Sequence, residues 1–98
     1  MMTKHLSHMH STFTFSLPDW LKEFDFQSYY PDNESKIRLA YALVEKNIYH
    51  DSGGPFSAIA FDREGRVVQA AVNQVVPADS SVLHAEMALT MLTQQSLA

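Results

Sequence analysis

The sequence predicts an α/β domain with its elements in the order helix, strand, strand, helix, preceded by an aromatic arm. Two segments whose apolar residues recur at three- and four-residue steps predict the helices. Between them, two short apolar runs on either side of a polar, glycine-containing loop are typical of a β-hairpin. A chain of 98 residues accommodates one such domain, so we divide it into a leader and arm, 1–32, and the domain, 33–98.

The leader and arm differ in composition. The leader, 1–11, is polar, and we interpret it as a mobile terminus, although histidine-rich tracts also bind metals adventitiously; its histidines are His5, His8 and His10. In the arm, 13–17 alternates with the period of a strand, and 18–24 fits one helical turn. We expect the large side chains of the arm to pack onto their own domain or onto a second subunit: Phe13, Phe15, Leu17, Trp20, Leu21, Phe24, Phe26, Tyr29 and Tyr30.

The first helix is expected to begin after the Pro-Asp-Asn turn at 31–33 and to end near Tyr49. His50 is expected to cap its C-terminus, where the helix dipole favours a cation. We expect the residues after it to stop the helix, because Gly53 and Gly54 allow positive φ values and Pro55 cannot donate a hydrogen bond. The expected apolar stripe is Ile37, Ala40, Tyr41, Val44 and Ile48.

The hairpin and the last helix follow. Residues 56–61 and 67–72 predict two antiparallel strands joined by a loop at 62–66. Small residues would let helices approach one face of the ribbon closely: Ala58, Ala60, Ala70 and Ala71. After a loop over 73–81, the last helix is expected to begin at about Val82. Its expected stripe is Leu83, Met87, Ala88, Met91 and Leu92.

The composition argues against several classes of protein. An apolar content of 46% is enough for a core and argues against disorder. Seven Lys and Arg against eleven Asp and Glu give a net charge of −4, which provides no basic stripe for nucleic acid; a local patch or a partner could still supply one. The chain shows no apolar run long enough to span a membrane and no secretory signal, so we expect a cytoplasmic protein.

The tripeptide His84-Ala85-Glu86 at the start of the last helix is the main chemical signal. A neutral imidazole can bind zinc, and a nearby carboxylate can shuttle protons between a metal-bound water and a substrate. Residues two apart point about 200° away from each other in mid-helix, so His84 and Glu86 can share a site only at the helix mouth. The alternative is an exposed helix-start histidine followed by a first-turn acid that the helix dipole stabilises.

From about Ile37 to Gln95 the sequence resembles the zinc-dependent cytidine and deoxycytidylate deaminase superfamily. The resemblance runs in order through the leading helix, Gly-Gly-Pro-Phe at 53–56, the small-residue hairpin, Asn73 with Val75-Val76, and the tripeptide at 84–86. Gly-Gly-Pro-Phe and Asn-x-Val-Val look most like the guanine deaminase branch. The resemblance implies the N-terminal portion of a three-layer α/β/α domain of the cytidine deaminase type.

The resemblance also implies a role for each matching residue. His84 would be a zinc ligand, and Glu86 would be the general acid/base that passes a proton from the zinc-bound water to the departing amine. Asn73 would hydrogen-bond the edge of the purine, Phe56 would wall the base pocket, and the Ala85 N–H would hold a ring carbonyl. The reaction would be the hydrolytic deamination of a nucleobase or nucleoside, most similar to guanine, with release of ammonia.

Simpler roles stay open for three of these positions. Phe56 could be a core residue at the start of a strand, since aromatic side chains at strand ends usually pack. Asn73 could be a turn former after a strand. The glycines at 53–54 could be simply a helix stop, to which the resemblance adds that they position the pocket.

The sequence departs from the family because it contains no cysteine, and hence no Pro-Cys-x-x-Cys segment. Zinc needs about four ligands, and His84 with a water supplies two. We therefore expect the N-terminal half of a deaminase, inactive by itself, whose complete form is a homodimer acting on a small purine or pyrimidine. The competing hypothesis is an inactive fragment or interaction module that pairs its sheet edge and its arm with another chain.

Overall fold

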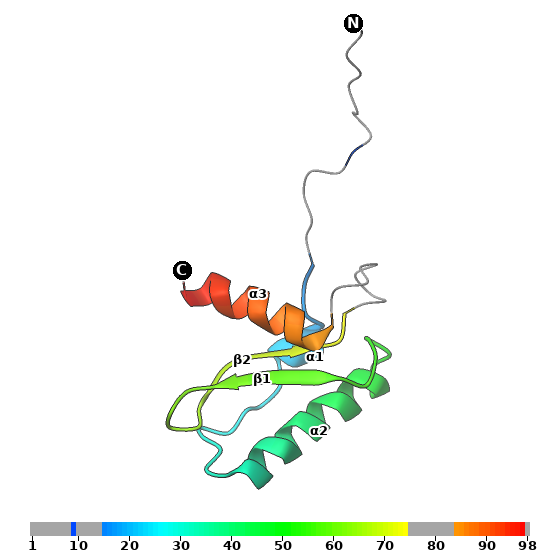
Figure 1. The fold of residues 1–98 in the computed structure, drawn as a ribbon. Helices are drawn as coiled ribbons and strands as arrows, with labels where there is room; N and C mark the ends of the chain where they lie inside the picture. Colours follow the sequence, from blue (N-terminus) through cyan, green and yellow to red (C-terminus); the bar gives the residue numbers. More distant parts are fainter. Residues whose placement is uncertain (1–8, 10–14, 75–83, 98) are drawn as a thin grey trace, which may run out of the picture.

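Two helices lie on opposite faces of a two-stranded antiparallel ribbon (Figure 1). The computed structural model of the chain describes residues 9, 15–74 and 84–97. The elements are α1 (Asp19–Lys22), α2 (Asn33–Tyr49), β1 (Ser57–Phe61), β2 (Val67–Val72) and α3 (Ala85–Leu97), which confirms the expected order. Among the described helices, none combines the length and the apolar character that crossing a bilayer requires. Several predictions lie outside the described residues: those for His5, His8, His10, Phe13, Val75, Val76 and Leu83.

The start of α2 is fixed by a reciprocal cap. The Asp32 carboxylate accepts a hydrogen bond from the Ser35 N–H at 2.8 Å, and the Ser35 hydroxyl oxygen accepts one from the Asp32 N–H at 3.3 Å. These bonds satisfy two N–H groups near the N-terminus of the helix. The Ser35 N–H is the main reason that the pKa of Asp32 lies below its usual value. The expected helix start is confirmed.

The end of α2 differs in detail from the expectation. His50 is the C-terminal cap, as predicted. Asp51, with φ 51°, takes up the left-handed conformation first, and the expected positive φ is confirmed at Gly53, with φ 155°. Aspartate tolerates this conformation because its short polar side chain can hydrogen-bond locally. Gly53 and Gly54, which follow, are needed for close packing.

The ribbon presents different residues to the two helices. The register pairs Ala58 with Ala71 and Ile59 with Ala70, and a bulge follows Ala60. Because side chains alternate between the two faces, Ala71 faces α3 and packs on Ala88, while Ala70 belongs to the core shared with α2. The expectation that the four alanines share one face is therefore wrong for Ala70. The small residues allow close approach on both faces.

The buried face of α2 is not the stripe that the sequence predicted. Its buried residues are Leu39, Leu43 and Asn47, at steps of four. Ile37, Tyr41 and Ile48, expected in the core, are 55%, 66% and 55% exposed. We call Ile37, Ala40, Tyr41, Val44 and Ile48 the open stripe. The apolar surface of α2 is wider than the ribbon, so the ribbon covers only part of it.

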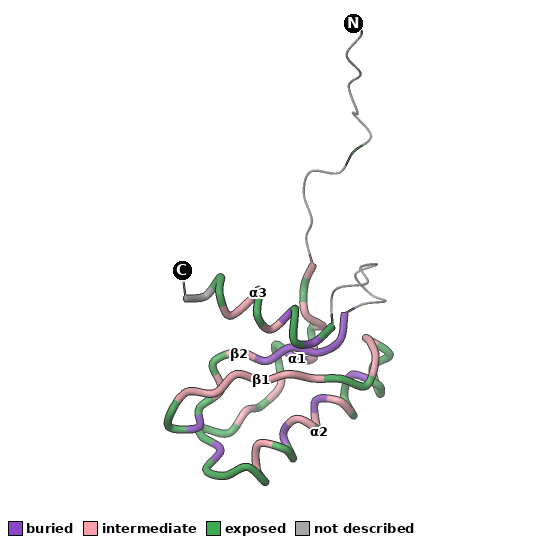
Figure 2. Tube along the Cα trace, viewed as in Figure 1, coloured by how far each residue is buried: buried purple, intermediate pink, exposed green. Residues whose placement is uncertain are grey.

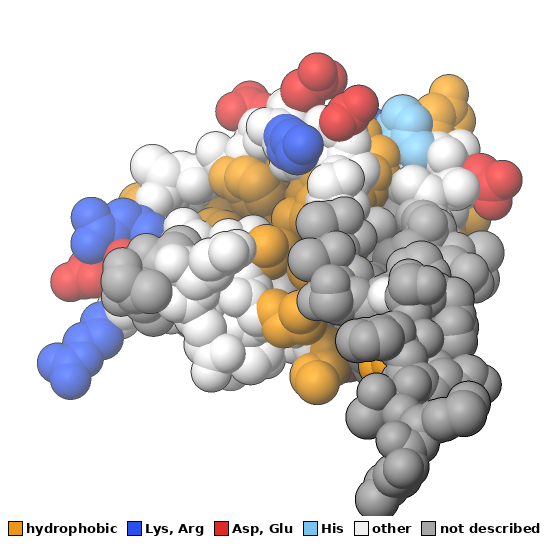
Figure 3. All heavy atoms as spheres, turned by 90° about the horizontal axis from the view of Figure 1, so that it is seen from above, with side chains coloured by type: hydrophobic (Ala, Val, Ile, Leu, Met, Phe, Trp, Pro, Cys, Tyr) orange, Lys and Arg blue, Asp and Glu red, His pale blue; other side chains and the backbone are white. Residues whose placement is uncertain are grey.

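The apolar face of α3 is also only partly covered. Ala85 and Ala88 are fully buried, whereas Met87 and Met91, expected in the buried stripe, are 48% and 40% exposed. Figure 3, seen from the side on which α3 lies in Figure 1, shows hydrophobic side chains uncovered between charged residues. The prediction of buried Met87 and Met91 is thus wrong for the described part of the chain.

The described part of the arm, 15–32, packs on its own domain. Leu21 and Tyr30 are each only 4% exposed and belong to the same core as Leu43. The Tyr30 N–H donates to the Gly65 carbonyl at 2.7 Å. A Cβ on Gly65 would lie 2.3 Å from the Tyr30 carbonyl oxygen, so only glycine permits this contact at φ 81°. The helical turn after Pro18 is confirmed, whereas 15–17 forms no regular strand.

Candidate functional site

His84 lies at the mouth of α3, immediately outside the helix. Its carbonyl oxygen accepts a hydrogen bond from the Ala88 N–H at 3.0 Å, which makes His84 the N-cap residue. The helix therefore begins at Ala85, later than the expected Val82. This start allows His84 and Glu86 to serve one site, because His84 is not held at a mid-helix angle. Both side chains are exposed, at the positive end of the helix dipole.

Asn73 connects this helix mouth to the loop after α2. It is buried, with 6% of its surface exposed. Its side-chain oxygen accepts from the Gly54 N–H at 3.4 Å, and its Nδ2 lies 3.4 Å from His84 Nδ1. An amide nitrogen can only donate, so this arrangement fits a neutral His84 whose Nδ1 accepts the hydrogen bond. Both contacts are long for hydrogen bonds.

Gly53 and Gly54 pack directly against Asn73. A Cβ on Gly53 would lie 2.0 Å from the Asn73 carbonyl oxygen and 2.8 Å from Asn47 Nδ2. The role of Gly53 is therefore close backbone approach. The expectation that this segment also positions the site fits the contact between Gly54 and Asn73.

Asn47, Ser52 and Trp20 extend the same polar network, and no sequence motif predicted a role at the site for any of them. Asn47 is fully buried on the core side of α2, and its Nδ2 donates to the Gly54 carbonyl at 2.8 Å. The Ser52 hydroxyl donates to Asn47 Oδ1 at 2.7 Å and accepts from Trp20 Nε1 at 2.9 Å. A chain of hydrogen bonds thus runs from the arm to the segment beside His84. The available signal was a polar residue in the Leu39, Leu43, Asn47 series.

Phe56 is exposed, whereas its interpretation as a core residue at the start of a strand predicted a buried ring. Its ring is 56% exposed, so that interpretation is wrong for the described part of the chain. The Phe56 carbonyl accepts from the Asn73 N–H at 3.0 Å, which continues the ladder of the ribbon by one pair. Directly paired residues direct their side chains to the same face, so Phe56 and Asn73 share the face on which α3 lies. This placement is compatible with a pocket wall beside Asn73.

The described residues do not by themselves make a zinc site. No group of three or more His, Asp or Glu side chains among them is close enough to hold a metal ion. The whole chain contains no cysteine and so offers no thiolate, and His84 is the imidazole that the described residues place at this helix mouth. A tetrahedral zinc site needs about four ligands. His84 can serve as one of them, and the others would have to come from outside the described residues.

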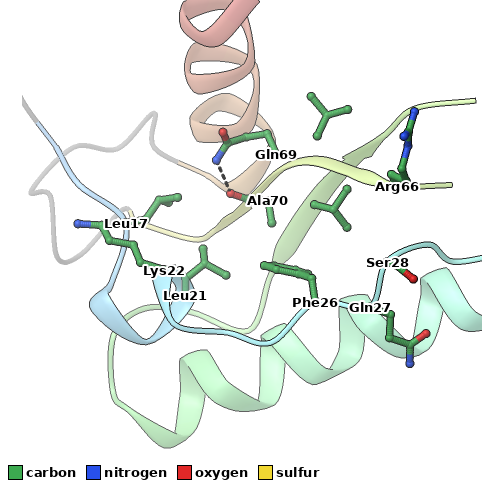
Figure 4. A pocket seen from close by; sticks show the side chains of 11 residues that line it. Leu17, Leu21, Lys22, Phe26, Gln27, Ser28, Arg66, Gln69 and Ala70 are labelled. Atoms are coloured by element: carbon green, nitrogen blue, oxygen red, sulfur yellow. Dashed lines mark hydrogen bonds between the residues drawn. The ribbon is translucent and has the colours of Figure 1, made fainter. Parts of the chain in front are cut away.

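A separate hollow of about 400 Å³ lies between the arm and the first part of β2 (Figure 4). Leu17, Leu21 and Phe26 line it from the arm, and Gln69 and Ala70 line it from β2. Asn73 and His84 do not belong to this lining. The end of β2, beyond the hollow, is buried and leads toward the start of α3 (Figure 2). The candidate site lies at that end of the strand.

The chain is similar to solved structures of guanine deaminase NE0047 from Nitrosomonas europaea. One, in complex with 8-azaguanine, is 32% identical with a TM-score of 0.79, over 93% of this chain and 50% of that chain. Another, with 2,6-diaminopurine, is 33% identical with a TM-score of 0.79, over 91% of this chain and 48% of that chain. The chain thus spans about half the length of these relatives.

A scan of family models gave no match, and a search of curated proteins gave no significant one. The structural similarity therefore carries the assignment of the fold. The three layers formed by α2, the ribbon and α3 are those of the N-terminal half of a deaminase-like α/β fold.

Proposed function

We propose that this chain supplies the His84 and Glu86 half of a site that hydrolytically deaminates a guanine-like purine. The observation that carries the proposal is the meeting of His84, buried Asn73 and Gly54 in one polar network at the mouth of α3. The similarity to half of a guanine deaminase, with purine analogues bound to that enzyme, supports the substrate class. The complete activity would need residues beyond the described part of this chain.

Glu86 would carry out the proton transfers. Its carboxylate is exposed in the first turn of α3, where it can reach a substrate in front of the helix mouth. In the reaction, a water oxygen attacks the ring carbon and the bond from that carbon to the exocyclic nitrogen breaks. Glu86 would accept the proton of the water and give it to the nitrogen, which leaves as ammonia.

His84, Asn73, Phe56 and Ala85 would bind and orient. His84 would be one zinc ligand, and a bound zinc would supply an activated water. Asn73 would direct an amide group toward the purine edge, and the Phe56 ring would cover one side of the base. The Ala85 N–H would hold a ring carbonyl, because first-turn N–H groups of a helix have no partner within it. The homodimer and the cytoplasmic location stay predictions.

A chimera tests the proposal directly. In it, this chain replaces the matched half of the Nitrosomonas guanine deaminase, and ammonia release from guanine and zinc content are measured. We expect His84→Ala to abolish zinc binding and Glu86→Gln to lower turnover at least about 100-fold with zinc retained. Glu45→Gln, the same change at an exposed position of α2, is the matched control and should leave turnover unchanged.

A second function, that of an interaction module without catalysis, is favoured by the exposed apolar side chains of α2 and α3. The same chimera separates the two. A cooperatively folded chimera that binds no zinc and releases no ammonia would contradict the deaminase proposal and favour the interaction module. Full activity in Glu86→Gln would contradict the assigned proton transfer.

A further inference from the structure

Asn47 is a polar side chain at a fully buried position of α2. It follows Leu39 and Leu43 at steps of four, where a third leucine would need no hydrogen-bond partner. Burying an amide costs free energy unless its hydrogen bonds are made. Those of Asn47 are made with the loop that follows α2. The reason for an amide at this position therefore lies in the loop.

The Asn47 side chain joins two points of this loop. Its Oδ1 accepts from the Ser52 hydroxyl at 2.7 Å, and its Nδ2 donates to the Gly54 carbonyl at 2.8 Å. The two ends of an amide have opposite hydrogen-bonding capacity, and a carbonyl can only accept. The partners of Asn47 therefore fix both the position of its side chain and which end of the amide faces Gly54.

Gly54 transmits this constraint to Asn73. While the Gly54 carbonyl is held by Asn47, the Gly54 N–H donates to Asn73 Oδ1 at 3.4 Å. The Gly54 backbone lies directly against the Asn73 side chain, because a Cβ on Gly54 would lie 3.4 Å from that oxygen. With Oδ1 turned toward Gly54, Nδ2 is the end of the amide that lies 3.4 Å from His84 Nδ1.

The end of α2 and the start of α3 lie at the same end of the ribbon, on its opposite faces (Figure 1). We infer that Asn47 is a positioning residue of the candidate site, which acts through Gly54 to set the direction in which Asn73 presents its amide to a purine. The inference rests on the proposed function. It assigns to Asn47 no contact with the substrate or with a metal.

Replacement of Asn47 by leucine removes this link without leaving its partners unbonded. The Gly54 carbonyl keeps the Phe56 N–H as a donor, at 2.9 Å. The Ser52 hydroxyl keeps Trp20 Nε1 as a donor and the backbone carbonyl of residue 47, at 3.3 Å, as an acceptor. Asn47→Leu should therefore fold, because the large cost of unsatisfied buried polar groups is avoided.

NMR of the 98-residue chain tests the geometry independently of catalysis. In Asn47→Leu, we expect the Asn73 side-chain amide signals to shift and the Gly54 N–H to exchange at least about tenfold faster. Ser52→Ala, which removes the donor to Asn47 Oδ1, should shift the same signals by less. Leu39→Val trims a buried side chain two turns earlier on the same helix, and as the matched control it should leave these signals unchanged.

The chimera described above extends the test to binding, with 8-azaguanine as the probe because a relative binds it. We expect Asn47→Leu to weaken this binding about tenfold, which is the size of effect that one hydrogen bond gives. Because Asn47 acts through Asn73, adding Asn47→Leu to Asn73→Ala should weaken binding no further. Leu39→Val should preserve the affinity.

The other outcomes overturn the inference. Unchanged Asn73 signals in folded Asn47→Leu would show that Asn73 is oriented without Asn47, and equal shifts in Leu39→Val would show a general loosening of α2. Should Asn47→Leu not fold, Ser52→Ala decides by the same criteria. Additive losses of affinity would show that Asn47 does not act through Asn73.

One combination of results separates the inference from the proposed function. Shifted Asn73 signals in the chain, together with a folded chimera that does not bind 8-azaguanine, would sustain the positioning of Asn73 by Asn47. The same combination would contradict the proposed function.

Discussion

The two edges of the β-ribbon differ in how far the rest of the described chain covers them. Beside β2, residues of the arm enter the core, and Leu21 and Tyr30 are almost fully buried. Beside β1, no further strand pairs with the ribbon among the described residues, and Ile37, Tyr41 and Ile48 of the open stripe are exposed. The arm is thus an integral part of the domain, whereas the apolar side chains on the other side of α2 are largely exposed.

This contrast extends to the candidate site. Its side toward the arm is held by the hydrogen-bond chain from Trp20 through Ser52 and Asn47 to Gly54. Its outer side consists of exposed groups, Phe56, His84 and Glu86. The hydrogen-bonded groups thus lie on the inner side of the candidate site, and the groups that would meet a metal or a substrate are exposed.

The largest expected effect is a difference in stability between substitutions on the buried side and on the exposed side of α2. Leu43→Ala removes a fully buried side chain and should lower the free energy of unfolding by about 2–5 kcal/mol. Tyr41→Ala, two residues away on the open stripe, should change it by less than about 0.5 kcal/mol in this chain. Urea denaturation of both variants measures the difference. Equal losses in the two variants would contradict this difference between the two sides of α2, because they would mean that Tyr41 is already covered.

A smaller effect is expected from cutting the link between the arm and the site. Trp20→Phe keeps a ring but removes the donor to Ser52, so it should lower the free energy of unfolding by about 1 kcal/mol. NMR should also show a shift of the Asn73 side-chain amide signals. Tyr29→Phe, which removes a hydroxyl from a side chain that is 55% exposed in the same arm, is the control. Unchanged Asn73 signals in Trp20→Phe would show that the arm does not reach the site.

The smallest effect concerns acid and the hairpin end of the ribbon. The Arg66 N–H, which donates to Asp62 at 2.9 Å, is the main cause that holds the pKa of Asp62 below its usual value of 3.8. A lowered pKa means that the ionised carboxylate stabilises the fold above pH 3.8, and that this contribution fades as the pH falls further. The stability difference between the natural chain and Asp62→Asn should therefore shrink between pH 6 and pH 3. A difference independent of pH would exclude the carboxylate as its source.

Much of the fold could be predicted because the signals are local. The Pro-Asp-Asn turn, the polar loop at 62–66 and the periodicity of the apolar residues predicted each element within a few residues. The prediction of the buried face of α2 was wrong because amphipathic periodicity shows a wide apolar face but not which part of that face meets a given neighbour. Ile37 and Leu39 both read as apolar, and only the position of the ribbon separates them.

The sequence by itself determined the order of the elements, the absence of thiolate ligands and the residues at 84–86 that suggest hydrolytic chemistry. These follow from residue types and short spacings. Three features became visible only in the folded chain: buried Asn47 and Asn73 meet at Gly53 and Gly54, the arm packs beside β2, and no described residue pairs with the outer edge of β1. Such facts depend on contacts between residues far apart in the chain, and the steric fit that selects them exists only after the layers have packed.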